Sequence, residues 1–77
     1  MFKLLDTVAL THDFAESGLR QGDLGAIVDV LSPDKFEVEF VVASGRTQAL
    51  LCLGVNDLRH VGDRDLIAVR SLESAVS

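Results

Sequence analysis

At 77 residues, the chain is long enough for one domain and too short for a second core. A single cysteine, Cys52, excludes an internal disulfide, and neither His12 nor His60 lies at zinc-finger spacing from it. The net charge of −5, from seven Lys and Arg against twelve Asp and Glu, argues against nucleic-acid binding because acidic surfaces repel phosphate backbones.

Hydrophobic burial must therefore stabilise the fold, and 48% of the residues are hydrophobic, a high share for so small a chain. We expect part of this apolar surface to belong to an interface with another chain. No apolar run approaches the roughly 18 residues that a membrane helix needs. Asp6 interrupts the apolar start, so we interpret that segment as a strand and not as a signal peptide. The composition predicts a cytoplasmic protein without membrane contact.

Alternating apolar and polar residues predict an all-β fold. Residues 36–40 place three large apolar side chains on one face and two carboxylates on the other, as in a half-buried strand. Residues 6–11 alternate in the same way, and the apolar, β-branched run at residues 25–31 predicts a strand covered on both sides. Further strands are expected at residues 47–53 and 58–61. The expected core consists of Val8, Leu10, Val28, Val30, Val38, Phe40 and Leu51, with Ile27 and Val41 on the outer face.

The connections favour a small five-stranded antiparallel SH3-like barrel over residues 1–61. Pro33 suits a tight turn between the second and third strands, and Gly45 suits one between the third and fourth. Residues 54–57 predict one turn of 3₁₀ helix before a short last strand. A long polar loop at residues 12–23 separates the first two strands. Gly18, Gly22 and Gly25 are expected to serve positive backbone φ angles where this loop turns into the barrel.

Residues 62–77 form a C-terminal tail with an ambiguous pattern. Leu66, Val69, Leu72 and Val76 would share one stripe of a helix that Asp63 could cap. Residues 66–69 also fit a strand, and disorder is a third alternative. A barrel closed by residue 61 leaves little core for these side chains, so we expect the tail to form an intermolecular contact, most simply in a homodimer.

The chain also resembles a bacterial family, domain of unknown function 4926. The resemblance covers residues 3–61 and rests on LLDTVAL at residues 4–10, GLRQGDLG at residues 18–25 and FEVEF at residues 36–40, with GRT at 45–47 and DLR at 57–59. It implies a small β-barrel and brings no established activity and no catalytic or binding residues. An association of such genes with a small neighbouring gene suggests an antitoxin-like or binding role.

Candidate chemistry in the sequence is weak. Glu37 and Glu39 share a strand face and could act as paired carboxylates, but a solvated outer face explains them better. His12, Asp13 and Glu16 could contribute metal ligands, but a polar loop is the simpler interpretation. Cys52 stands among leucines, where a thiol is expected to pack as a small hydrophobic group.

We therefore expect a non-catalytic protein-binding module without cofactor, metal or evident small-molecule substrate, and antitoxin-like toward a neighbouring gene product. The first alternative is a small hydrolase or ligand-binding protein that uses Glu37 and Glu39. The second is a nucleic-acid-associated SH3-like barrel, by analogy of fold alone. The residues expected to contact a partner protein are Glu37, Glu39, Leu66, Val69, Leu72 and Val76.

Overall fold

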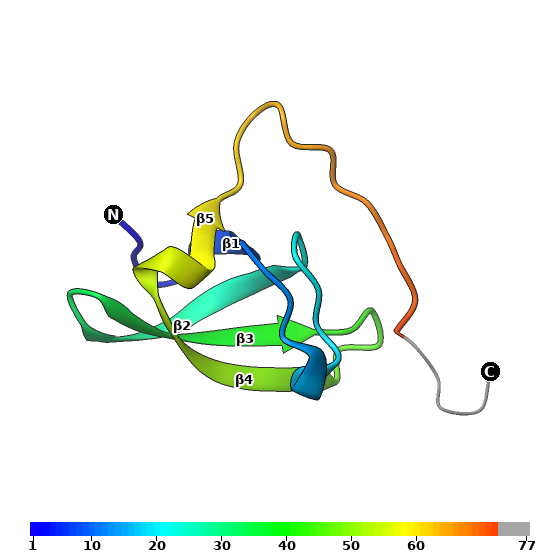
Figure 1. Cartoon of the computed structure of the whole chain (residues 1–77), viewed down its shortest axis with the longest axis horizontal. Coiled ribbons are helices and arrows are strands. Elements are labelled where there is room, and N and C mark those ends of the chain that lie inside the picture. Colours follow the sequence, from blue (N-terminus) through cyan, green and yellow to red (C-terminus); the bar gives the residue numbers. More distant parts are fainter. Residues whose placement is uncertain (73–77) are drawn as a thin grey trace.

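A computed structural model describes residues 1–72, which contain one five-stranded antiparallel sheet (Figure 1). The strands are β1 (Thr7–Leu10), β2 (Leu24–Ser32), β3 (Lys35–Val41), β4 (Thr47–Gly54) and β5 (Leu58–His60). Their order in the sheet is β4-β3-β2-β1-β5, and every pair of neighbours is antiparallel. The all-β fold and all five predicted strands are confirmed.

Short elements connect the strands as the turn residues predict. A 3₁₀ helix, η2 (Val55–Asp57), forms the corner between β4 and β5, and a second one, η1 (Ala15–Ser17), lies within the long first loop. The sheet order places β4 and β5 at the two ends of the sheet. Strand number, order and direction therefore agree with the SH3-like arrangement, whereas closure into a barrel stays a prediction. No helix within residues 1–72 is long and apolar enough to cross a membrane.

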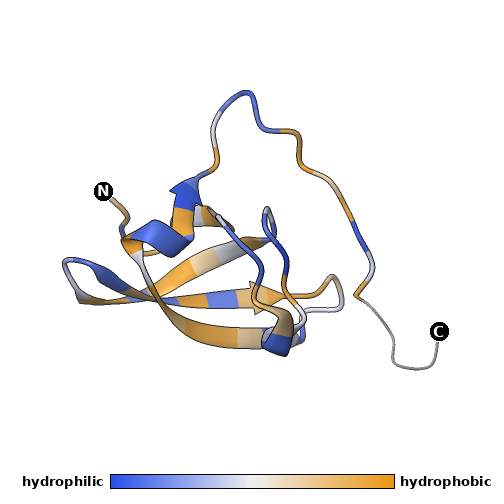
Figure 2. Ribbon diagram, viewed as in Figure 1, coloured by the Kyte–Doolittle hydropathy of each residue, from blue (hydrophilic) through white to orange (hydrophobic). Residues whose placement is uncertain are grey.

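The core consists of apolar side chains from all five strands together with Leu19 of the first loop. Figure 2 shows hydrophobic residues recurring along the strands. Val8, Leu10, Val38 and Phe40 are buried as predicted, and Leu51 packs partly buried against them. The sequence analysis missed several further core residues. These are Ala9, Leu19, Ile27, Phe36, Leu53 and Leu58.

The predicted orientation of β2 is wrong. Val28 is only partly buried and Val30 is 44% exposed, whereas Ile27, expected on the outer face, is 0% exposed. At the start of β2, Gly25 and Ile27 face the core, while Ala26 and Val28 are only partly buried. Gly25 can face the core because it has no side chain and leaves room for Val38 and Phe40 of β3. The pairing of β2 with β3 then shifts after Ile27 and again after Val30, so a simple alternation does not extend along the strand.

Gly25 is required where β2 crosses the core. A Cβ atom added there would lie 2.7 Å from Cγ1 of Val38 and 2.8 Å from Cε2 of Phe40. Neither neighbour is the free end of a flexible surface chain, since both side chains are buried in the core. The expectation of positive φ is therefore wrong for Gly25, which serves close packing inside the sheet, whereas Gly18 and Gly22 have positive φ as predicted.

The tail does not form the helix that its apolar stripe predicts. Residues 62–72 contain neither helix nor strand and extend along the molecule beyond β5 (Figure 1). A helix there would have no uncovered core face on which to bury its stripe, and polar contacts hold the chain extended instead. Val76 lies outside the described residues.

Candidate interaction site

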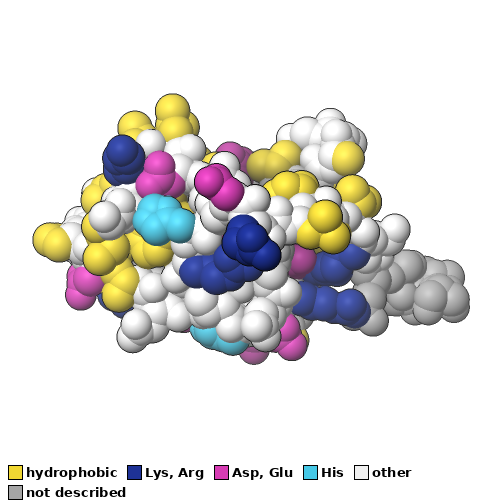
Figure 3. Space-filling model, turned by 90° about the horizontal axis from the view of Figure 1, so that it is seen from above, with side chains coloured by type: hydrophobic (Ala, Val, Ile, Leu, Met, Phe, Trp, Pro, Cys, Tyr) yellow, Lys and Arg dark blue, Asp and Glu magenta, His cyan; other side chains and the backbone are white. Residues whose placement is uncertain are grey.

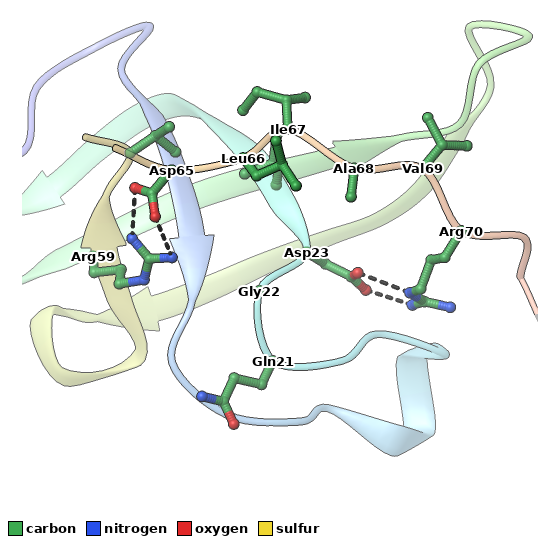
Figure 4. A pocket seen from close by; sticks show the side chains of 12 residues that line it. Gln21, Gly22, Asp23, Arg59, Asp65, Leu66, Ile67, Ala68, Val69 and Arg70 are labelled. Carbon is green, nitrogen blue, oxygen red and sulfur yellow. Dashed lines mark hydrogen bonds and ion pairs between the residues drawn. The ribbon is translucent and has the colours of Figure 1, made fainter. Parts of the chain in front are cut away.

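The tail is fixed at two points, and the first is Asp65. Its carboxylate oxygens lie 2.9 Å and 3.2 Å from the two terminal guanidinium nitrogens of Arg59 on β5 (Figure 4). The same carboxylate accepts a hydrogen bond of 2.6 Å from the Gly62 amide. These contacts direct the chain away from β5, and the guanidinium lowers the pKa of the Asp65 carboxyl.

Arg70 fixes the other end of the tail to the loop before β2. Its Nε donates to Oδ1 of Asp23 over 2.9 Å, and its Nη2 donates to Oδ2 of the same carboxylate over 2.5 Å (Figure 4). Nη2 also lies 3.1 Å from the carbonyl oxygen of Gly18. A single guanidinium thus forms a two-pronged bond with one carboxylate and reaches a backbone carbonyl.

The loop orients Asp23 independently of the tail. Oδ2 of Asp23 accepts the backbone N–H of Arg20 over 2.8 Å, which holds the carboxylate in a tight turn. Backbone hydrogen bonds between Leu10 and the loop fix this turn to β1. The turn also requires positive φ, which Gly22 supplies at +91°. The hydrogen bond from Arg70, aided by the Arg20 amide, holds the pKa of the Asp23 carboxyl below its usual range despite partial burial.

Between these two fixed points, residues 66–69 present apolar side chains to solvent. We call these four residues the apolar tail segment. Leu66 is 91% exposed, Ile67 63% and Val69 97%. Figure 2 shows the segment as a hydrophobic stretch between polar neighbours, and Figure 3 shows hydrophobic side chains on the side of the molecule where the tail passes. Exposed apolar residues gathered in this way are typical of an interaction surface.

Two shallow grooves lie where the tail passes over the sheet. One has a volume of about 290 Å³ and lies between the apolar tail segment and Leu24, with Arg59 and Asp23 on its walls. The other, of about 260 Å³, lies between Arg70 and the β3–β4 hairpin and includes Val41. Arg70 lines both grooves, and apolar side chains are part of both linings.

The partner-binding residues predicted from the sequence do not form one surface. Leu66 and Val69 belong to the apolar tail segment, and Leu72 lines the second groove. Glu37 and Glu39 are half-buried on the outer face of β3, and neither lines a groove described above. The Thr47 hydroxyl donates to Glu39 from β4. This hydrogen bond gives one of the two carboxylates a structural role.

In the first loop, the candidate metal ligand His12 forms an ion pair. Nε2 of His12 lies 2.7 Å from Oδ1 of Asp57, and the ring packs on Phe14 with 4.5 Å between ring centroids. The Asp13 carboxylate accepts a hydrogen bond from the backbone N–H of Gln21. Within residues 1–72, no three His, Cys, Asp or Glu side chains are grouped as metal ligands would be.

The prediction that Cys52 packs as a buried hydrophobic group is wrong. Its side chain is exposed, opposite Glu37 in the β3–β4 ladder, because it alternates with the buried Leu53. The sequence analysis also missed Asp23 and Arg70, which are 47 residues apart. The available signals were an aspartate bracketed by Gly22 and Gly25 and an arginine within an apolar tail.

Most of the chain matches a known protein family. A family model described as a domain of unknown function, DUF4926, matches residues 4–60. This range includes all five strands and Asp23 and ends before the tail. A search of curated proteins and a search of solved structures found no match.

Proposed function

The chain belongs to the DUF4926 family, and on this premise we propose that it is a non-catalytic protein-binding module. The observation that carries the proposal is the apolar tail segment, three of whose side chains are mostly exposed while both ends are fixed by ion pairs. Exposed apolar side chains gathered in this way leave water when a partner covers them, which favours binding. Large exposed aliphatic side chains then supply contact area to a partner.

The net charge of the chain favours a basic partner. The chain has a net charge of −5, which accelerates encounter with a positively charged protein and disfavours contact with nucleic acid. An antitoxin-like role fits these properties, since such a module would cover a functional surface of a small basic protein. We propose the product of the adjacent gene as this partner.

A hydrolase is less well supported. The groups with shifted pKa values near the tail, Asp23 and Asp65, are each paired with an arginine, which stabilises the carboxylate and does not prepare it for proton transfer. Glu37 and Glu39 lie on the outer face of the sheet, away from both grooves. The ion pairs of Asp65 with Arg59 and of Asp23 with Arg70 instead hold the tail in its extended path.

Co-purification with the adjacent gene product tests the proposed function. A variant carrying Leu66→Ser, Ile67→Ser and Val69→Ser should lose the complex. The matched control carries Leu4→Ser, Leu31→Ser and Leu50→Ser, which alter three leucines that are each about half exposed and lie outside the tail. This control should retain the complex, with circular dichroism showing that both variants are folded. Equal binding by the two variants would contradict the proposal.

A further inference from the structure

The loop before β2 forms a receptor for a guanidinium group. Asp23 presents both carboxylate oxygens, the Arg20 amide fixes one of them, and the Gly18 carbonyl adds a third acceptor. The Asp23 side chain is 19% exposed, so these acceptors are partly shielded from water. We call Asp23 together with the Gly18 carbonyl the arginine cradle. We propose that this cradle recognises an arginine of the partner protein, and that Arg70 occupies it in the free chain.

The geometry of the cradle selects arginine over lysine. Nε and Nη2 of Arg70 meet the two oxygens of one carboxylate, an arrangement that requires two donors held in a plane. Nη2 also reaches the Gly18 carbonyl. An ammonium group is a single charged point and cannot match both oxygens in this way. The inference rests on the proposed function, because it gives the partner of that module a defined chemistry.

The resident tail gives the form of the ligand. Aliphatic residues stand on both sides of Arg70 in the chain: Val69, which is 97% exposed, precedes it, and Leu72, which lines the second groove, follows it. The tail lies there without helix or strand. A matching ligand is therefore an extended segment with an arginine between aliphatic residues. Gly18 and Gly22 shape the cradle through positive φ, which gives a function to the glycine pattern at residues 18–25.

A basic partner is a better occupant than a second copy of this chain. Each copy carries a net charge of −5, so two copies repel one another, whereas a basic protein is attracted. Exchange of tails between copies would also replace one Arg70 contact by an identical one and add no new contact at the cradle.

The resident tail competes with the partner for the cradle at an effective concentration of the order of millimolar.

A peptide with the sequence of residues 64–72, labelled with fluorescein, tests the cradle in the full-length protein. Fluorescence anisotropy would measure its binding to the wild type, to Arg70→Ala and to the double variant Asp23→Asn/Arg70→Ala. Arg70→Ala vacates the cradle and should bind the peptide about fivefold more tightly than the wild type. The Asp23→Asn/Arg70→Ala variant should lose this gain, with circular dichroism showing that it is folded.

Altered peptides provide matched controls, because residues 64–72 contain two arginines. Replacing the arginine that corresponds to Arg70 by Gln, or by Lys, should weaken binding about fivefold, whereas replacing the one that corresponds to Arg64 by Gln should not. Equal effects of these two changes would show nonspecific charge attraction and overturn the proposal. So would failure of Arg70→Ala to bind the peptide.

Light scattering of the full-length protein distinguishes the two occupants. A monomeric wild type agrees with a partner protein as the ligand. A dimer that Arg70→Ala converts to monomers would assign the cradle to a second copy and overturn the proposal. If the peptide fails to bind while the adjacent gene product still requires Leu66, Ile67 and Val69, the arginine cradle is wrong and the proposed function stands.

Discussion

Nε2 of His12 lies 2.7 Å from Oδ1 of Asp57, which joins the first loop to the corner before β5. Asp57 also accepts the Gly54 amide over 2.9 Å at the start of η2. Thr11 reinforces this connection, since its hydroxyl donates to the carbonyl of Asn56 and its amide to that of Asp57. The first loop and the corner before β5 are therefore joined by one side-chain ion pair and by two hydrogen bonds that Thr11 donates to backbone carbonyls.

The His12–Asp57 ion pair predicts a pH dependence of stability. The hydrogen bond to Asp57 raises the pKa of His12 above its ordinary value of 6.5. Burial favours the neutral form of Asp57, but hydrogen bonds from His12 and Gly54 outweigh it and keep the pKa of Asp57 below 3.8. The contribution of His12 is complete below pH 6.5 and is lost as the pH rises through its raised pKa. That of Asp57 is complete above pH 3.8 and is lost as the pH falls through its lowered pKa.

Urea unfolding at a series of pH values measures this effect. The free energy of unfolding should fall as the pH rises above 6.5, and His12→Gln should remove this slope. His60→Gln serves as the matched histidine control because the ion pair is intact in it. If His12→Gln keeps the wild-type slope above pH 6.5, the ion pair does not contribute to stability.

Ile27 and Val30 should differ sharply in their importance to the fold. Ile27 is fully buried in the core, so Ile27→Ala should cost about 2–5 kcal/mol of unfolding free energy. Val30 is 44% exposed, and Val30→Ala should change stability by about 0.5 kcal/mol. Chemical denaturation of both variants measures the difference. Equal losses would show that β2 is oriented as its sequence alternation suggests.

Gly25 should tolerate no side chain. Gly25→Ala forces Val38 and Phe40 to move, since the new Cβ atom would lie under 3 Å from each, and should cost about 1–3 kcal/mol. Gly54→Ala is the matched control because its Cβ atom would meet neighbours only at 3.7 Å or more. Thermal unfolding compares the two variants. A melting temperature of Gly25→Ala equal to that of Gly54→Ala would contradict the packing described for β2.

Local sequence patterns predict the strands well because strand periodicity and turn residues are local properties. The 3₁₀ corner at η2 and the hairpins at Pro33 and Gly45 follow from such signals. The orientation of β2 does not follow from local signals, because it depends on the space that Gly25 leaves for Val38 and Phe40 on another strand. A long apolar run fits either face equally well, so only the neighbouring strand decides which residues turn inward.

The site was less predictable than the sheet. Apolar spacing marks Leu66 and Val69 as interaction residues, but it also suggests a helix, since spacing alone ignores what the stripe can pack against. The extended path depends on contacts from Asp65 to Arg59 and from Arg70 to Asp23. The Arg70 contact joins residues 47 positions apart, and no local pattern encodes such a pairing.

The contact between Arg70 and Asp23 should control how readily the tail is released. Arg70 hydrogen-bonds Asp23 and Gly18 and is the fixed point beyond the apolar tail segment. Both side chains of the ion pair retain some exposure, at 27% and 19%, so its contribution is reduced to about 1 kcal/mol by solvent screening. That amount corresponds to a roughly fivefold rise in the released population when the contact is removed.

Limited proteolysis with chymotrypsin, which cleaves after large apolar residues, measures this release. Arg70→Ala and Asp23→Asn should each accelerate cleavage after Leu66 about fivefold, because a protease must draw the segment away from the sheet to bind it. Arg64→Ala is the matched control, since it removes a guanidinium from the same tail but leaves the Asp23 contact in place. Lowering the pH through the depressed pKa of Asp23, below 3.8, should release the tail of the wild type in the same way. An acid-active protease that cleaves at apolar residues can detect this release. If Arg70→Ala and Arg64→Ala are cleaved at the same rate, the Asp23 contact does not hold the tail on the sheet.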